Sequence, residues 1–173
     1  MNTLVLGGTG FLGSIIKSKY PTFIFWGRKE YTVETSNNED LIDFIKQNNI
    51  THIIDFTKNK KHHILPFVNF IRKLPNDVIY VNISTYGVMF NNMFLYEEEY
   101  YSTKKIVEKS IRPQDYNIRV PMVLESDDKL VIFNGVCTEY MYTLNPNEFL
   151  FHLMNILNYE PGTYVMPSRV VYK

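Results

Sequence analysis

The stretch Gly7-Gly8-Thr9-Gly10-Phe11-Leu12-Gly13 lies between a short apolar run and a segment with helical spacing. Residues 4–6 predict a buried strand, and residues 11–19 predict the helix that follows it. Glycines in such a unit allow a tight turn, close approach of the backbone to a diphosphate, and close packing of helix on strand. The first N–H groups of the helix then point at the phosphates. The stretch therefore predicts a dinucleotide site, and the alternative is a glycine-rich turn without a ligand.

The composition is that of a single α/β domain, with 173 residues, 45% hydrophobic content and no net charge. A chain of this length buries a substantial core. A neutral balance gives no reason to expect nucleic acid or a membrane surface as the main partner. The single cysteine, Cys137, excludes an internal disulfide and a cysteine-based metal site. No apolar run reaches the roughly 20 residues of a membrane helix, and no signal peptide precedes the first strand. We therefore expect a cytoplasmic protein without a metal.

Apolar runs alternate with helical patterns along most of the chain. This alternation predicts βαβ units and a doubly wound, Rossmann-type, mostly parallel sheet with helices on both faces. The expected strands span residues 4–6, 22–26, 52–56, 78–83 and 116–120, and the expected helices span 11–19, 38–47, 62–72 and 97–111.

The last fifty residues follow a different pattern. Two apolar runs, 130–133 and 136–140, flank Asn134-Gly135, which predicts a hairpin. Asn145-Pro146-Asn147-Glu148 predicts a helix start with an N-cap, a first-position proline and a capping box. That helix is expected to reach about residue 158 and to precede a strand at 163–166. We find no linker and no repeat, and expect one domain over residues 1–173.

Two Tyr-x-x-x-Lys registers overlap in the expected helix over residues 97–111, Tyr100 with Lys104 and Tyr101 with Lys105. Residues four apart share a helix face, so either lysine lies near its tyrosine. The first register belongs to a stripe expected to face the sheet, made of Tyr100, Thr103, Lys104, Val107 and Ile111. The second belongs to a stripe expected to be solvated, which includes Glu108 and Arg112. We favour Tyr100 and Lys104, and the alternative is chance co-occurrence in a chain with 13 tyrosines.

A tyrosine beside a lysine suits proton transfer. Free tyrosine titrates near pH 10, so acid–base work at neutral pH needs a shift of about 3 units. A neighbouring ammonium and a nicotinamide cation both favour the phenolate. Ser84-Thr85-Tyr86 directly follows the strand expected at 78–83. A hydroxyl there is well placed, because ligands bind beyond the carboxyl ends of such strands; the alternative is a turn residue that caps the next segment.

Taken together, these features resemble the extended short-chain dehydrogenase/reductase family of nucleotide-sugar epimerases, dehydratases and reductases. The spacing of Gly7, Gly10 and Gly13 matches the family's cofactor loop. Residues 83–90 are similar to the segment with its catalytic Ser or Thr, and Ser84-Thr85 matches the Ser-Thr with which this segment begins in the dTDP-4-dehydrorhamnose reductase type. Tyr100-x-x-Thr103-Lys104 with a trailing Glu108 resembles the family's Tyr-x-x-Ser-Lys helix. Ile118-Arg119-Val120-Pro121 resembles its next strand, so the resemblance covers about residues 3–121.

The resemblance implies an NAD(P)-dependent oxidoreductase that acts on a carbonyl or hydroxyl of a sugar-like, nucleotide-linked substrate, by reduction or epimerisation. It implies that Thr85 hydrogen-bonds the substrate oxygen and that Tyr100 exchanges its proton. Lys104 is implied to hold the nicotinamide ribose and to favour ionisation of the Tyr100 phenol. The implied cofactor-binding residues are Gly7, Gly10, Phe11, Leu12, Gly13, Arg28, Phe56, Thr57 and Lys104.

Two departures from the family pattern are visible. Asp55-Phe56-Thr57-Lys58 stands where the family carries an Ala-Ala or Ala-Gly pair, at a place where backbone approaches the cofactor. Only about fifty residues follow Pro121, so residues 122–173 are expected to form a reduced remnant of the family's substrate region. This second departure favours an alternative function, a dinucleotide-binding sensor or partner subunit without catalysis.

Cofactor preference and partners complete the expectations. Gly27-Arg28-Lys29 ends the second strand, where NAD-preferring proteins place an acidic residue. The cation predicts NADP over NAD, and the alternative is an exposed turn charge. For the basic cluster at residues 58–63, a solvated loop is favoured over a phosphate site. A homodimer through helices 62–73 and 97–111 is expected from the family's four-helix interface and from an apolar excess at Phe67, Phe70 and Ile71.

Overall fold

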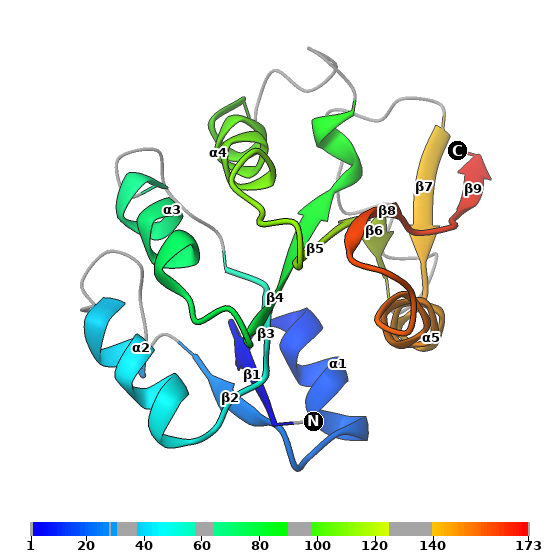
Figure 1. The fold of residues 1–173 in the computed structure, drawn as a ribbon. Coiled ribbons are helices and arrows are strands. Elements are labelled where there is room, and N and C mark those ends of the chain that lie inside the picture. The colour runs from blue at the N-terminus through cyan, green and yellow to red at the C-terminus, as the bar shows by residue number, and fades with distance from the viewer. Residues whose placement is uncertain are drawn as a thin grey trace.

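The computed structural model describes residues 2–27, 29–30, 38–57, 64–89, 98–124 and 140–172. Within these ranges, a six-stranded parallel sheet has the order β2-β1-β3-β4-β5-β8, and a three-stranded sheet has the order β6-β7-β9 (Figure 1). The strands are β1 Thr3–Leu6, β2 Ile24–Trp26, β3 His52–Asp55, β4 Ile79–Thr85, β5 Tyr116–Val120, β6 Met122–Val123, β7 Tyr140–Leu144, β8 Gly162–Val165 and β9 Arg169–Tyr172. The helices are α1 Phe11–Lys19, α2 Asn38–Gln47, α3 Ile64–Lys73, α4 Glu98–Glu108, α5 Pro146–Ile156 and the 3₁₀ turn η2 Tyr86–Val88.

Strand β1 illustrates why the large sheet carries helices on both faces. All four of its residues are buried, and successive side chains of a strand point to opposite faces. Leu4 and Leu6 pack into a cluster with α2, α3 and α4, whereas Val5 packs into a cluster with α1 and α5. Figure 1 shows the same division, with α2, α3 and α4 on one side of the sheet and α1 and α5 on the other. The predicted doubly wound α/β fold is confirmed.

The glycine-rich turn lies where the strand order reverses. β1 pairs with β2 on one side and with β3 on the other, which makes the edge beyond β1 and β3 the topological switch point of the sheet. Gly7 follows β1 with φ of +78°, a conformation that favours glycine. A Cβ on Gly13 would lie 2.6 Å from the Gly7 oxygen, so only glycine lets α1 pack this closely on the turn.

The region after β5 differs in part from the expected pattern. The capping box of α5 is confirmed, since the Asn145 side chain accepts the Glu148 N–H at 2.9 Å and the Glu148 carboxylate accepts the Asn145 N–H at 2.8 Å. The hairpin predicted at residues 130–140 lies almost entirely outside the described residues, which resume at β7. β6 pairs parallel with β7, and β7 pairs antiparallel with β9; neither β6 nor β9 was expected.

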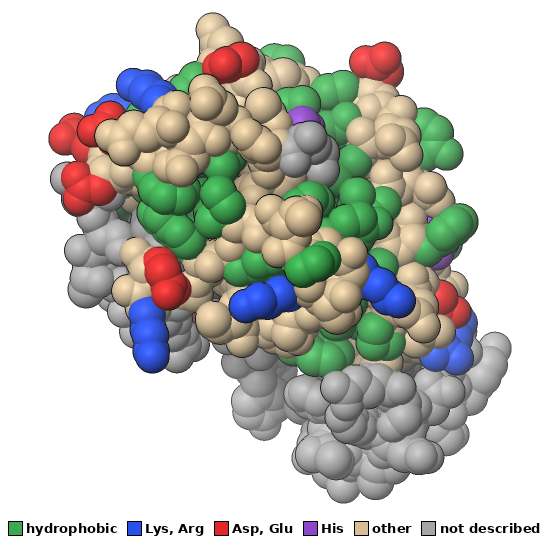
Figure 2. All heavy atoms as spheres, turned by 90° about the horizontal axis from the view of Figure 1, so that it is seen from below, with side chains coloured by type: hydrophobic (Ala, Val, Ile, Leu, Met, Phe, Trp, Pro, Cys, Tyr) green, Lys and Arg blue, Asp and Glu red, His purple; other side chains and the backbone are tan. Residues whose placement is uncertain are grey.

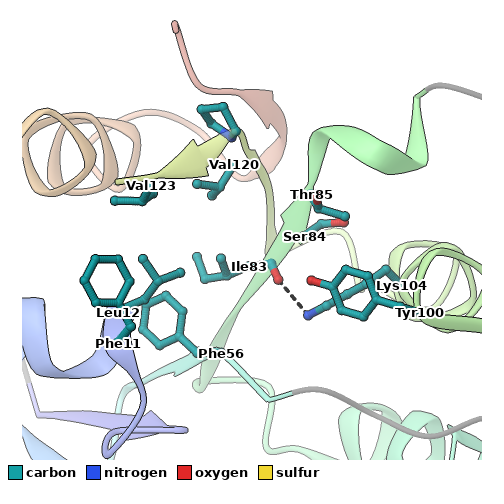
Figure 3. A pocket seen from close by; sticks show the side chains of 11 residues that line it. Phe11, Leu12, Phe56, Ile83, Ser84, Thr85, Tyr100, Lys104, Val120 and Val123 are labelled. Atoms are coloured by element: carbon teal, nitrogen blue, oxygen red, sulfur yellow. Dashed lines mark hydrogen bonds between the residues drawn. The ribbon is translucent and has the colours of Figure 1, made fainter. Parts of the chain in front are cut away.

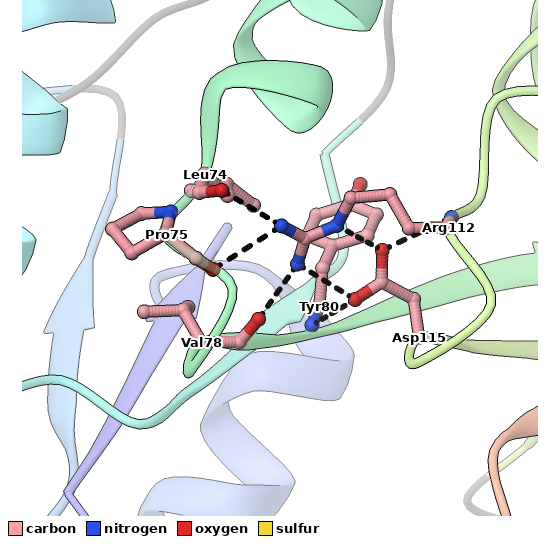
Figure 4. Close-up of polar contacts among 6 residues, drawn as sticks. All are labelled: Leu74, Pro75, Val78, Tyr80, Arg112 and Asp115. Atoms are coloured by element: carbon pink, nitrogen blue, oxygen red, sulfur yellow. Dashed lines mark hydrogen bonds and ion pairs between the residues drawn. The ribbon is translucent and has the colours of Figure 1, made fainter.

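A buried polar cluster ties the turn before β4 to the turn before β5. The Arg112 guanidinium uses all five of its N–H donors, on the Asp115 carboxylate at 2.8 and 2.9 Å and on the backbone carbonyls of Leu74, Pro75 and Val78 at 2.6 to 3.2 Å (Figure 4). The Asp115 carboxylate also accepts the Tyr80 backbone N–H at 2.9 Å. We name Arg112, Asp115 and these carbonyls the Arg112 cluster.

The prediction of a solvated stripe with Glu108 and Arg112 is wrong. Their side chains are only 10% and 11% exposed, because each charge has a fixed partner, Arg119 for Glu108 and Asp115 for Arg112. The opposite stripe is confirmed, since Thr103, Lys104 and Val107 are buried against the sheet. Helical spacing identified the buried face but could not reveal long side chains that bury themselves by pairing.

The surface offers two further observations. Figure 2 shows the molecule from below the view of Figure 1, and on this face positive and negative side chains lie interspersed with hydrophobic ones, in keeping with the neutral composition. Among the described helices, none combines the length and the apolar character required to cross a membrane.

Candidate active site

A cavity of about 220 Å³ lies at the carboxyl ends of β4 and β5. Ligands of open α/β sheets bind at this edge. Side chains from α1, α4 and four strands or their ends line it, as the close-up in Figure 3 shows. The lining residues are Phe11, Leu12, Phe56, Ile83, Ser84, Thr85, Tyr100, Lys104, Val120, Pro121 and Val123.

The cavity brings together residues that the sequence places far apart. The three predicted catalytic residues, Thr85, Tyr100 and Lys104, line it together with the predicted cofactor-binding residues Phe11, Leu12 and Phe56. In Figure 3 Phe11, Leu12 and Phe56 gather on one side, and Tyr100 lies on the other side beside the Lys104 ammonium. Gly7, Gly10 and Gly13 lie in the turn before and within α1, outside the lining, and Arg28 lies outside the described residues.

Lys104 is anchored deep in this site. Only 4% of the residue is exposed, and its Nζ donates to the Ile83 carbonyl at 2.8 Å and to the Thr57 carbonyl at 3.2 Å. Burial lowers the pKa of Lys104, and the carboxylates of Asp55 and Glu108 oppose that change. An ammonium has three N–H donors, so two are used on described carbonyls and one remains for a group in the cavity.

The structure separates the two Tyr-x-x-x-Lys registers. Tyr100 lines the cavity beside Lys104. The Tyr101 ring instead packs on η2, where a Cβ added to Gly87 would lie 1.9 Å from Tyr101 Cε1. Tyr101 is therefore half-buried rather than solvated as expected, because the missing Gly87 side chain makes room for its ring. Of the two tyrosines, Tyr100 is the one that faces a ligand space.

Ser84 and Thr85 differ in what their hydroxyls do. Ser84 Oγ donates to Glu108 Oε1 at 2.6 Å, and Arg119 binds the same carboxylate at 3.1 and 2.8 Å. Burial raises the pKa of Glu108, but the hydrogen bonds from Arg119 and Ser84 outweigh it and leave that pKa below its usual value. The Ser84 proton is thus committed to a stable anion.

Thr85 keeps its proton available. Its Oγ1 accepts the Gly87 N–H at 3.3 Å as the N-cap of η2, so the hydroxyl still has an O–H to donate into the cavity. The Tyr86 hydroxyl donates to the Met166 carbonyl, which ties η2 to the segment between β8 and β9. These bonds hold the Thr85 side chain in a defined place.

The start of α1 leaves room for an anion. Gly10, the N-cap residue, supplies no side-chain cap, and no acidic residue occupies the first turn. A Cβ on Gly10 would meet only the Gly7 oxygen, at 3.2 Å, so the space beside the free N–H groups is otherwise open. Nearby, no described residue hydrogen-bonds the buried Thr57 hydroxyl. Both observations fit a phosphate-bearing, polar ligand.

Sequence reasoning missed several residues of this site. Val120 and Val123 line the cavity, and Asp55 lies buried at the end of β3 behind it. The signal for Asp55 was available, since a carboxylate at the last position of a buried strand needs a partner. Val120 and Val123 gave no such signal, because their place depends on how β6 turns away from β5.

Comparisons with known proteins were informative only at the level of structure. No protein-family model and no curated protein matches the chain. A hypothetical dTDP-4-dehydrorhamnose reductase from Sulfolobus tokodaii is 16% identical, with a TM-score of 0.71 over 99% of this chain and 78% of that one. The dTDP-4-dehydrorhamnose reductase of Yersinia enterocolitica is 14% identical, with a TM-score of 0.71 over 99% and 76%. The dTDP-glucose 4,6-dehydratase of Bacillus anthracis, solved with NAD, is 15% identical, with a TM-score of 0.69 over 99% and 77%.

These similarities extend over nearly the whole chain at low identity, so they define the fold. The chain shares the Rossmann-type fold of dTDP-4-dehydrorhamnose reductases and of other NAD-dependent epimerase/dehydratase-type enzymes. The resemblance inferred from the motifs is confirmed at that level.

Proposed function

We propose that the chain is an NAD(P)-dependent oxidoreductase that acts on a carbonyl or hydroxyl group of a sugar-like, nucleotide-linked substrate. The observation that carries the proposal is the shared cavity, in which Thr85, Tyr100 and Lys104 lie across from an apolar wall next to the start of α1. The structural neighbours support it, since they include a dTDP-sugar reductase and an enzyme solved with NAD and UDP, WbmG of Bordetella bronchiseptica, 13% identical with a TM-score of 0.67 over 98% of this chain and 74% of that one.

The residues present suit a nicotinamide dinucleotide. The N–H groups at the start of α1 would hold the diphosphate, with Gly10 leaving space for it. Phe11, Leu12 and Phe56 would cover an aromatic ring, and Lys104 would hold a ribose hydroxyl with its remaining N–H. The bound nicotinamide would supply or accept the hydride.

Proton transfer would be the task of α4 and the end of β4. In the reductive direction, the Thr85 hydroxyl donates a hydrogen bond to the substrate oxygen and orients it. Tyr100 transfers its phenolic proton to that oxygen as negative charge develops there. The Lys104 ammonium favours the resulting phenolate. Reduction and epimerisation use the same groups in this way.

The preference between NADP and NAD depends on the end of β2. We propose NADP, with Arg28 on the additional phosphate. A carboxylate is also close, since Glu30 Oε2 accepts the Gly27 N–H at 2.8 Å. That bond uses one lone pair of Oε2 only, so the proposal of NADP rests on the cationic Arg28 after β2. In Arg28→Ala the ratio of NADPH to NADH affinity should fall, whereas in Glu30→Gln it should not.

We further propose a homodimer through α3 and α4. The residues first held to support it do not, because Phe67, Phe70 and Ile71 are at most 1% exposed and pack within the chain. The support comes instead from Leu65 on α3, 70% exposed, and Ile106 on α4, 36% exposed. Light scattering should give twice the chain mass, and Leu65→Glu should give a monomer; a monomeric wild type would contradict the proposal.

The experiment that tests the function combines binding and turnover. We expect calorimetry to detect NADPH binding, and dTDP-4-dehydrorhamnose to drive NADPH oxidation that Tyr100→Phe slows by a factor of about 10² to 10⁴. Binding of NADPH with no turnover of this or other nucleotide-linked keto-sugars would favour the alternative, a dinucleotide-binding sensor or partner subunit. Absence of nucleotide binding would contradict both.

A further inference from the structure

Behind the cavity, a buried carboxylate is clamped between two strands. Asp55, the last residue of β3, is 1% exposed. The Tyr80 hydroxyl of the neighbouring strand β4 donates to its Oδ2 at 2.5 Å, and the Thr57 N–H donates to its Oδ1 at 2.7 Å. Tyr80 is itself fully buried, with its ring against Phe67 at 6.3 Å between centroids. Asp55 therefore has little freedom to move.

The same turn leads directly to Lys104. Thr57 donates its N–H to Asp55 and offers its carbonyl to the Lys104 ammonium, at 3.2 Å. The second carbonyl that binds Lys104, that of Ile83, belongs to β4, the strand that also carries Tyr80. The Asp55 hydrogen bonds thus fix one of the two backbone acceptors that hold the ammonium.

Asp55 also acts on the Lys104 ammonium through its negative charge. On α4, Tyr100 lines the same cavity as Lys104, and Glu108 lies one helical turn after Lys104. Glu108 is already bound by Arg119 from β5 and by Ser84 from β4. The partners of Asp55 are neutral groups, so its charge is not neutralised by them. Of the two carboxylates that raise the pKa of Lys104 against burial, Asp55 has the larger effect.

We propose that Asp55, clamped by Tyr80, is a positioning residue that holds the Lys104 ammonium in place and in its charged form. A buried ammonium is costly unless it is hydrogen-bonded and electrically compensated. Asp55 provides both, the first through the backbone of Thr57 and the second through its own charge. The inference rests on the proposed function only in that Lys104 is taken as a residue of the active site.

The test follows the Lys104 ammonium itself. Protein labelled with ¹³C at the lysine ε-carbons is titrated by NMR, and the Lys104 signal is identified by its loss in Lys104→Gln. Asp55→Asn keeps the side-chain size and an oxygen for the Thr57 N–H but removes the charge. We expect the Lys104 midpoint to fall by about one pH unit or more in this variant.

Asp115→Asn is the matched control. Asp115 is also a buried carboxylate, and it accepts the backbone N–H of Tyr80 at 2.9 Å. The Asp115 charge, however, is paired with the Arg112 guanidinium. Its removal should leave the Lys104 midpoint unchanged. An unchanged midpoint in folded Asp55→Asn, or an equal fall in Asp115→Asn, would overturn the proposal. If Asp55→Asn does not fold, Asp55→Ser, which also removes the charge and is smaller, serves instead: a fall in the midpoint supports the proposal and no fall overturns it.

The titration needs neither nucleotide nor substrate, so it fails independently of the proposed function. NADPH calorimetry on the same samples makes the distinction. A lowered Lys104 midpoint in a protein that binds no NADPH would support the role of Asp55 and contradict the proposed function. An unchanged midpoint in a protein that binds and oxidises NADPH would do the reverse.

Discussion

Two polar clusters lie toward opposite ends of β4, and Tyr80 touches both. Its backbone N–H donates to Asp115 in the Arg112 cluster, and its hydroxyl donates to Asp55 in what we name the Lys104 cluster, made of Lys104, Asp55, Tyr100 and Thr85. In the Arg112 cluster every guanidinium donor meets an acceptor of the chain. In the Lys104 cluster the Tyr100, Thr85 and Lys104 side chains line a cavity.

The difference separates polar groups that stabilise from polar groups that bind. A buried charge with all its partners in the chain links two turns and needs nothing else. A buried charge that keeps a donor for a cavity leaves part of its hydrogen-bonding capacity to a ligand. The following predictions test this distinction, from the largest expected effect to the smallest.

Tyr100→Phe should lower turnover of a nucleotide-linked keto-sugar by a factor of about 10² to 10⁴, the range for loss of a general acid–base group. The ring packing is kept, so NADPH affinity and the unfolding midpoint should change little. Tyr101→Phe is the control, because its ring packs on η2 away from the cavity, and it should be near wild type. Full turnover in Tyr100→Phe would show that Tyr100 is not the acid–base residue.

Arg112→Met should lower the free energy of unfolding by about 3 kcal/mol, because it leaves the Asp115 carboxylate buried without its charged partner. Urea denaturation measures the loss. NADPH affinity of the folded variant should stay at the wild-type value, since the cluster is closed to ligands. Arg72→Met, on the exposed side of α3, should lie within about 0.5 kcal/mol of wild type. A weaker NADPH affinity in folded Arg112→Met would contradict the claim that the Arg112 cluster takes no part in ligand binding.

Two glycines, Gly13 within α1 and Gly10 at its N-cap, should differ in what an alanine substitution changes. Gly13→Ala places a Cβ 2.6 Å from backbone atoms of Gly7 and Gly8, so unfolding should become easier by about 1 to 3 kcal/mol. Gly10→Ala meets only the Gly7 oxygen at 3.2 Å and should leave stability nearly unchanged, yet weaken NADPH binding about tenfold by filling the phosphate space. Thermal unfolding and calorimetry check the pair; equal NADPH affinity in Gly10→Ala would argue against a diphosphate there.

Glu108 should contribute a small, pH-dependent part of the stability. Because hydrogen bonds from Arg119 and Ser84 outweigh burial and hold its pKa in the folded chain below the usual 4.5, its carboxylate stabilises the fold above that value. The contribution is lost as pH falls through the lower, folded-state pKa. Glu108→Gln should therefore cost about 1 kcal/mol at neutral pH and less in acid. Asp43→Asn, exposed on α2, is the surface control and should lie within about 0.5 kcal/mol of wild type at neutral pH.

Much of the architecture was predictable, because it depends on local patterns. Buried parallel strands appear as continuous apolar runs, and β1, β4 and β5 lie where such runs are found. The α5 capping box needs only residues three apart in the chain, and it formed as expected. The glycines at positions 7 and 13 could likewise be predicted, since the turn itself requires a positive φ at Gly7 and a close approach of the helix at Gly13.

The sequence by itself determined the fold class, the glycine-rich turn and the buried face of α4 that carries Lys104, because periodicity and spacing encode which residues share a face. Only the tertiary structure decided that Glu108 and Arg112 are buried, that Asp55 stands behind Lys104, and that Val120 and Val123 close the cavity. These features depend on segments far apart in the sequence, such as Arg119 for Glu108, Tyr80 for Asp55 and the carbonyls of residues 74–78 for Arg112. Such pairings arise only when the strands come together in the order β3-β4-β5, which no local pattern specifies.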